Sequence, residues 1–306
     1  MKIPQTGEKY PGKIGDVILG KGEYVAGGSD GMPLLSFENS LKRRAMVAGE
    51  IVDDLTDYPP LAASMFDNRQ KDPVEWALMW KAMGADMICI RLKGTDPDKG
   101  NRPPEDAAAI VKKVADAVDI PLIVYGCGIP SVDGRTMKAV SETVKGTRLI
   151  LGKADEDDYK TISSAAMAGK HVLIAFSNLD VNLAKQMNIV LNDFGIRPDD
   201  ILMDPLMAPL GMGLDYSYSV NERIRLAALS GDKMLQVPVI CDATGAWDVG
   251  DAINEDAELG DVKSRVTWWE AMTALAAIVS GADIVIMRGP GAADMILGYA
   301  DELRGD

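Results

Sequence analysis

The sequence predicts an α/β protein, a (βα)8 TIM barrel with a short N-terminal hairpin extension, and three observations lead to this prediction. From residue 45 onward, short apolar runs of strand length alternate with amphipathic stretches of helix length, the rhythm of βα units around a parallel sheet. Eight such runs are present, which is the number of strands in a closed barrel of this type. No glycine-rich phosphate loop follows the first run, and this disfavours the competing doubly wound open sheet.

The first 44 residues are predicted to form an N-terminal extension with a β-hairpin, ahead of a barrel domain of residues 45–306. They are rich in Gly, Pro and Lys. Two apolar runs, residues 17–19 and 24–26, flank a turn that contains Gly20-Lys21-Gly22. Paired apolar runs around a glycine-containing turn are typical of a hairpin.

The barrel strands are predicted from the apolar runs in chain order. They are residues 46–52, 86–92, 121–125, 148–151, 172–176, 201–203, 237–241 and 283–287. Two of the junctions repeat one pattern, because residues 84–91 and 281–288 both read Gly-Ala-Asp, four apolar residues and Arg. This repetition indicates that the chain is built from repeated βα units.

The intervening helices are predicted from apolar residues spaced three and four apart, for example in residues 110–118 and 183–194. Ser219 and Glu222 have the spacing of a capping box in front of the apolar stripe 220–228. This pair predicts a helix that starts at Ser219.

The charge balance excludes some partners. The 306 residues include 46 acidic and 32 basic side chains, for a formal net charge of −14. Nucleic acids and anionic membranes are bound by clustered Lys and Arg, so we expect neither as a partner.

Cysteine usage and the apolar pattern indicate the compartment. The three cysteines, Cys89, Cys127 and Cys241, are far apart and form no CxxC pair, so we expect no disulfide framework and no zinc or iron–sulfur motif in this chain. No apolar h-region follows the start, and no run approaches the ~18 apolar residues of a membrane span. We therefore expect a cytoplasmic protein.

Functional residues of such barrels lie on the loops at the C-terminal ends of the strands. The glycine-containing segments 126–128 and Gly211-Met212-Gly213 follow two strands and allow a close backbone approach. The polar residues at these ends are Glu50, Asp53, Arg91, Cys127, Lys153, Asn178, Asp180, Asp204, Asp242 and Arg288. They indicate either a binding cavity or buried charges that pair with one another, with Arg91 and Arg288 neutralising Glu50, Asp204 or Asp242.

Two further chemistries are open at these positions. Glu50, Asp204 and Asp242 offer the oxygen ligands that Mg²⁺ prefers, and Lys153 could form a Schiff base if burial lowered its pKa. The single histidine, His171, precedes its strand and is therefore expected at the opposite, N-terminal rim. Histidine acid–base chemistry and histidine metal ligation at the site are not expected.

Several longer runs are too specific to be generic barrel sequence. They are residues 76–77, 84–97, 159–162, 165–168, 180–189, 203–205, 210–213, 216–220, 222–229 and 231–238. Together these runs, which cover essentially the whole barrel, resemble the small (delta) subunit of the corrinoid iron–sulfur protein of the acetyl-CoA synthase/CO dehydrogenase system.

The resemblance implies a βα barrel paired with a large subunit in a heterodimer, in an anaerobic pathway. The large subunit would carry an iron–sulfur cluster and a cobamide, which lies between it and the barrel mouth. The cobalt would accept a methyl group from a methyltetrahydropterin through a separate methyltransferase and deliver it to acetyl-CoA synthase/CO dehydrogenase. The chain lacks the corrinoid signature DxHxxG, so cobalt ligation and catalysis are not expected of it.

On this basis the mouth residues are expected to contact the corrin. From their positions at strand ends, six residues are expected to form hydrogen bonds with the corrin amides: Arg91, Asn178, Asp180, Asp204, Asp242 and Arg288. Three loop residues are expected to contact the ring face: Gly211, Met212 and Gly213. The alternative is a methyltetrahydropterin:corrinoid methyltransferase, in which Asn178, Asp180 and Asp204 would surround a pterin. A metal-dependent or Schiff-base lyase is a third class, supported by barrel analogy alone.

Overall fold

The computed structural model describes residues 9–34 and 43–304, and their eight parallel strands close into a barrel in the order β10-β3-β4-β5-β6-β7-β8-β9. All eight predicted barrel strands are confirmed, with ends that differ by a few residues. The strands are β3 Met46–Val52, β4 Met87–Arg91, β5 Leu122–Tyr125, β6 Ile150–Ala154, β7 Val172–Phe176, β8 Ile201–Asp204, β9 Val239–Asp242 and β10 Ala282–Met287.

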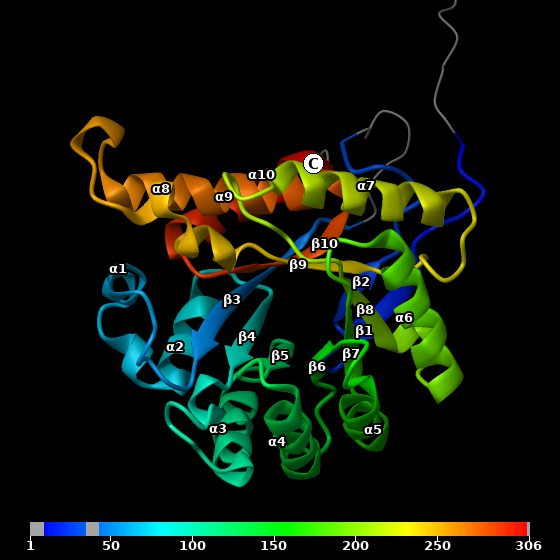
Figure 1. Cartoon of the computed structure of the whole chain (residues 1–306), viewed down its shortest axis with the longest axis horizontal. Helices are drawn as coiled ribbons and strands as arrows, with labels where there is room; N and C mark the ends of the chain where they lie inside the picture. Colours follow the sequence, from blue (N-terminus) through cyan, green and yellow to red (C-terminus); the bar gives the residue numbers. More distant parts are fainter. Residues whose placement is uncertain (1–8, 35–42, 305–306) are drawn as a thin grey trace, which may run out of the picture.

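Helices surround the barrel (Figure 1), with α2 to α5 along its lower edge and α7, α9 and α10 along its upper edge. They are α1 Pro60–Ala63, α2 Pro73–Ala82, α3 Pro104–Ala117, α4 Pro130–Thr143, α5 Tyr159–Gly169, α6 Val181–Phe194, α7 Leu214–Leu229, α8 Gly250–Ile253, α9 Val262–Ser280 and α10 Pro290–Arg304. Short 3-10 helices are Ser64–Phe66, Arg69–Lys71, Lys93–Thr95, Pro198–Asp200, Thr244–Asp248 and Ala257–Leu259. Among the described residues, no helix combines the length and the apolar character needed to cross a membrane.

The predicted start of α7 at Ser219 is wrong. The helix begins five residues earlier, at Leu214, and its N-cap is Gly213 with φ 101°. Glycine adopts this left-handed conformation without strain, so the chain turns directly from the preceding loop into the helix. Ser219 is an exposed residue within the helix.

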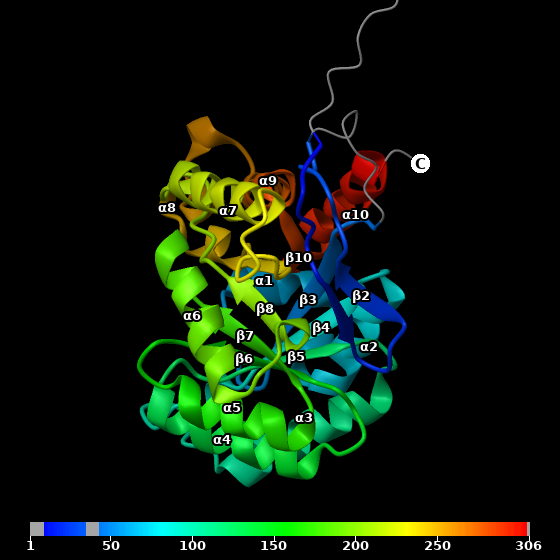
Figure 2. The ribbon, with the colours of Figure 1, turned by 90° about the vertical axis from the view of Figure 1, so that its right-hand side faces the viewer.

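The predicted hairpin is confirmed as β1 Asp16–Leu19 paired antiparallel with β2 Tyr24–Gly27. Its inward side chains, Val17, Leu19 and Ala26, are buried in one cluster with the residues that fill the barrel interior. In Figure 2 the hairpin, in blue, lies in front of the barrel strands. It therefore closes the N-terminal end of the barrel. The other parts of the predicted extension, residues 1–8 and 35–42, lie outside the described residues, and the domain boundary at residue 45 stays a prediction.

The repeated Gly-Ala-Asp pattern has one structural role in both places. Asp86 accepts a hydrogen bond from the Val47 amide at 2.8 Å, and Asp283 accepts one from the Val239 amide at 2.9 Å. Each carboxylate therefore satisfies an amide near the start of the neighbouring strand. Each also pairs with an arginine, Asp86 with Arg44 and Asp283 with Arg225.

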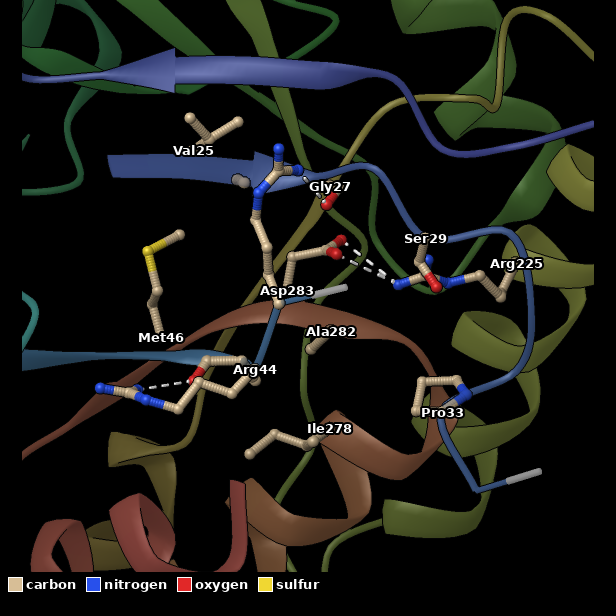
Figure 3. A pocket seen from close by; sticks show the side chains of 13 residues that line it. Val25, Gly27, Ser29, Pro33, Arg44, Met46, Arg225, Ile278, Ala282 and Asp283 are labelled. Atoms are coloured by element: carbon tan, nitrogen blue, oxygen red, sulfur yellow. Dashed lines mark hydrogen bonds and ion pairs between the residues drawn. The ribbon is translucent and has the colours of Figure 1, made fainter. Parts of the chain in front are cut away.

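Arg44, Arg225 and Asp283 from these ion pairs line a cavity of about 30 Å³ beside the hairpin, shown in Figure 3. That volume is enough for one or two water molecules. The N-terminal end of the barrel is thus packed and charge-paired.

Candidate functional site at the barrel mouth

Four charged side chains from different strands form a continuous chain at the barrel mouth. Glu50 of β3 is fully buried and lies between two arginines. Arg91 Nε donates to Glu50 Oε1 at 2.6 Å, and Arg288 Nε donates to Glu50 Oε2 at 2.5 Å. Arg91 Nη2 also donates to Asp242 Oδ2 at 2.6 Å. The predicted pairing of Arg91 and Arg288 with mouth carboxylates is confirmed.

A second ion pair lies on the opposite side of the mouth. Lys153 Nζ is 2.7 Å from Asp204 Oδ2, and it lies over the rings of Tyr125 and Phe176, at 5.3 and 4.8 Å from their centroids. Arg91 lies over Tyr125 as well, at 5.2 Å. The Tyr125 ring is therefore held between two cations.

A glycine makes room for this ring. A Cβ atom at Gly152 would lie 2.7 Å from the Tyr125 ring, closer than packed atoms approach, so a side chain there would displace the tyrosine.

The ion pairs keep the mouth carboxylates ionised. Burial raises the pKa of Glu50, but Arg288 and Arg91 outweigh it and hold this pKa below its usual range. Burial likewise opposes ionisation of Asp242, and Arg91 and Lys153 lower its pKa well below the usual range. Neither carboxylate holds a proton to donate at neutral pH. The arrangement suits a fixed, charge-balanced surface better than proton transfer.

Two recesses open at the mouth. The β5 recess, of about 260 Å³, is lined by Arg91, Lys93, Tyr125, Lys153 and Phe176 together with loop residues that include Asp133, Asp155 and Asp158. The β3 recess, of about 230 Å³, is lined by Glu50, Tyr58, Arg91, Lys93, Lys99 and Arg288 among others. Arg91 and Lys93 line both recesses and so form the ridge between them.

Of the strand-end residues named from the sequence, Glu50, Arg91, Asp242 and Arg288 join one chain of ion pairs, and Lys153 pairs with Asp204. Asp53 pairs instead with Arg102, and the amide of Cys127 donates to Asp133. Asn178 and Asp180 are exposed, and Asp180 caps α6 by accepting hydrogen bonds from the amides of Asn182 and Leu183.

The loop Gly211-Met212-Gly213 lies apart from the ion pairs. Met212 is 66% exposed, and the two glycines line a separate shallow hollow beside α7. The contacts proposed for this loop, and for Asn178 and Asp180, stay predictions.

Sequence reasoning missed four mouth residues, Tyr58, Lys93, Tyr125 and Phe176. A signal was present for two of them, because Tyr125 and Phe176 are the last residues of β5 and β7. Only polar residues at strand ends were considered, although an aromatic ring at that position also reaches the mouth.

The other chemistries considered from the sequence find little support in the geometry. Glu50, Asp204 and Asp242 each pair with a cation, and the part of the chain that the structure describes holds no group of three or more metal-ligand side chains. His171 lies at the N-terminal rim as predicted. It is buried, its Nδ1 accepts a hydrogen bond from the Leu149 amide at 3.1 Å, and burial lowers its pKa to about 4.

Glu270 of α9 holds one side of the mouth in place. This fully buried carboxylate accepts hydrogen bonds from the amides of Arg288 and Gly289, at 2.5 and 2.8 Å, and from Trp247 Nε1 at 2.9 Å. It thereby fixes the backbone from which Arg288 reaches Glu50. Burial raises the pKa of Glu270 to about 7, although the three donors oppose this.

The raised pKa of Glu270 predicts a pH-dependent stability. An unfolded carboxyl group has a pKa of about 4.5, so between this value and 7 the folded chain keeps a proton that the unfolded chain releases. The contribution of Glu270 to the free energy of unfolding therefore falls as the pH rises through this window, by about 3 kcal/mol. Urea unfolding of the wild type and Glu270→Gln across this range should show the wild type losing stability relative to the variant. Parallel pH curves would contradict the assignment.

Comparison with known proteins places the chain in a family. The family model described as CO dehydrogenase/acetyl-CoA synthase delta subunit matches residues 16–297. Among solved structures, dihydropteroate synthases share the barrel fold. That of Xanthomonas albilineans with 4-aminobenzoic acid has a TM-score of 0.58 at 14% identity, over 88% of this chain and 96% of the other. That of Coxiella burnetii with pteroic acid has a TM-score of 0.56 at 15% identity, over 86% and 94%. Such low identity establishes the fold alone.

Curated relatives agree with the family model. The acetyl-CoA decarbonylase/synthase complex subunit delta of Methanocaldococcus jannaschii is 33% identical over 293 residues, which cover 92% of this chain and 72% of the relative. The same subunit of Archaeoglobus fulgidus is 33% identical over 301 residues, covering 92% and 67%. The resemblance found in the sequence is confirmed, and the chain belongs to the CO dehydrogenase/acetyl-CoA synthase delta subunit family.

Proposed function

We propose that this chain is the small subunit of a cytoplasmic corrinoid iron–sulfur protein, a methyl carrier between a methyltetrahydropterin methyltransferase and acetyl-CoA synthase. Its large subunit would bind the cobamide and the iron–sulfur cluster, and the mouth of the barrel would cover the cobamide. The family match supports a role inside a multisubunit assembly, because the relatives are named as subunits of an acetyl-CoA decarbonylase/synthase complex.

The observation that carries the proposal is the internal charge balance of the mouth. Three carboxylates, Glu50, Asp204 and Asp242, pair with three cations, Arg91, Lys153 and Arg288. Groups that are already paired and hydrogen-bonded do not need a substrate to satisfy them. Such a surface is suited to cover a neutral macrocycle and exclude water, while the partner performs the chemistry.

The size of the recesses agrees with a covering role. They hold about 260 and 230 Å³, below the ~300 Å³ at which pockets for whole small-molecule ligands begin. A corrin ring would therefore lie across the mouth, with only its side chains entering the recesses.

The alternative function is a methyltetrahydropterin:corrinoid methyltransferase. The observation in its favour is the barrel shared with dihydropteroate synthases, one of which is described in complex with 7,8-dihydropteroate. A pterin site made of Asn178, Asp180 and Asp204 would need these side chains to converge. Asp204 is buried and paired with Lys153, whereas Asn178 and Asp180 are exposed.

Anaerobic purification of the tagged chain from its native host separates the two functions. The carrier subunit should co-purify with a cysteine-rich polypeptide and show the visible absorption of a corrinoid. A colourless protein without a partner that binds methyltetrahydrofolate would overturn the proposal and favour the methyltransferase.

A further inference from the structure

Lys93 differs from the other cations of the mouth because it has no carboxylate partner. Arg91, Lys153 and Arg288 all form ion pairs. Within residues 9–34 and 43–304, Lys93 forms none, and its Nζ donates one hydrogen bond, to the carbonyl oxygen of Cys127 at 3.3 Å. An ammonium group has three donors, so two remain for a ligand.

The position of Lys93 gives a ligand access to these donors. It lines both the β5 recess and the β3 recess, and Tyr125 lines the first as well. The unused donors of Lys93 beside these recesses indicate a ligand with hydrogen-bond acceptors.

The charges around the β5 recess indicate that this ligand group is neutral. Its lining holds three cations, Arg91, Lys93 and Lys153, and three carboxylates, Asp133, Asp155 and Asp158. Arg91 ends β4, Lys93 follows it and Lys153 lies on β6. The carboxylates lie beyond the strands, Asp133 in the first turn of α4 and the other two between β6 and α5. A carboxylate ligand would be repelled by these acids and by the net charge of −14. A primary amide suits both the cations and the carboxylates of the lining. Its carbonyl oxygen accepts a hydrogen bond from the lysine, and its N–H groups donate to an acid.

Burial supports this choice of partner for Lys93. Burial, and after it the charges of Arg91 and Lys99, lower the pKa of Lys93. The charge of Glu50 opposes this lowering only in part, and Glu50 forms no ion pair with Lys93 in the described residues, so a strong acceptor such as an amide oxygen would stabilise this partly desolvated cation.

We propose that the β5 recess binds an amide side chain of the cobamide, and that Lys93 donates a hydrogen bond to its carbonyl oxygen. This inference rests on the proposed function, which supplies the cobamide. It goes further by naming the recess, the donor and the chemical group that is bound.

The test measures how fast cobamide leaves the complex of this chain with its corrinoid-binding partner, in the presence of a corrinoid-trapping protein. Lys93→Met removes the donor and keeps a side chain of similar length. We expect release roughly tenfold faster than in the wild type, the effect of losing one charge-assisted hydrogen bond. Lys93→Leu, which also has no donor, is a second loss variant in case the methionine variant does not assemble, and it should also release faster.

Lys138→Met is the matched control. Lys138 is exposed on α4, is paired with Glu142 at 4.0 Å and lines neither recess, so this variant should release cobamide at the wild-type rate. Wild-type release rates in both assembled Lys93 variants, or equal acceleration in the Lys138 control, would overturn the inference and leave the proposed function standing. A wild-type complex without corrinoid would overturn both.

Discussion

Replacing Glu50 with glutamine is expected to lower the free energy of unfolding by about 3–5 kcal/mol, because it leaves a buried charge network without its central anion. Glu50 is fully buried and accepts hydrogen bonds from both Arg91 and Arg288. A glutamine has one carbonyl oxygen and would direct its NH2 group at one of the two guanidinium groups. The two guanidinium groups would then lie close together with no negative charge between them to offset their repulsion.

Chemical denaturation followed by tryptophan fluorescence measures this effect. Asp57→Asn is the control, since Asp57 is 63% exposed and its ion pair with Lys99 is near solvent. Exposed pairs contribute roughly 0–1 kcal/mol, so this variant should unfold close to the wild type. Equal stability of Glu50→Gln and the wild type would show that the two arginines do not depend on Glu50.

Replacing Leu19 with alanine is expected to cost about 2–5 kcal/mol, the usual effect of truncating a buried leucine. Leu19 belongs to the hairpin, yet its side chain is fully buried among residues that fill the barrel interior. Its truncation would leave a cavity at the closed end of the barrel.

The neighbouring residue on the same strand is the control for this experiment. Ile18 points the other way and is 51% exposed, so Ile18→Ala should change the midpoint of denaturation little. A small effect of Leu19→Ala would mean that the hairpin is an appendage instead of part of the barrel core. Two separate unfolding transitions would mean the same.

The barrel strands could be predicted because each contains a short apolar run between more polar segments. The repeated Gly-Ala-Asp junction was found for a similar reason, and the structure explains it through Asp86 and Asp283, which accept hydrogen bonds from neighbouring strand amides. Such patterns are local in the chain.

The pairing of the mouth residues is not local. Arg288 meets Glu50 across 238 residues, and Arg91 meets Asp242 across 151. The strand-end rule placed these side chains at one edge of the barrel but could not select partners, and Asp204 pairs with Lys153 instead of an arginine. The strand-end rule did not single out Lys93, two residues beyond the end of β4, although it named Asn178 at the same distance beyond the end of β7.

The start of α7 is wrongly predicted for a different reason. Ser219 and Glu222 have capping-box spacing, but a left-handed Gly213 starts the helix earlier. Tertiary packing decides which of several local signals is used. It also decides where the confirmed hairpin lies, because the contact of Val17 and Leu19 with the barrel interior is not visible in a local pattern.

The measurement that tests the central claim most directly is amide hydrogen exchange of the chain, alone and in the complex with its corrinoid-containing partner. If the barrel mouth covers the cobamide, peptides that span residues 93–102, 126–130 and 153–158 exchange more slowly in the complex. Peptides of the hairpin, residues 16–27, exchange equally in both. Protection confined to the hairpin end, with unchanged exchange at the mouth, would contradict the account.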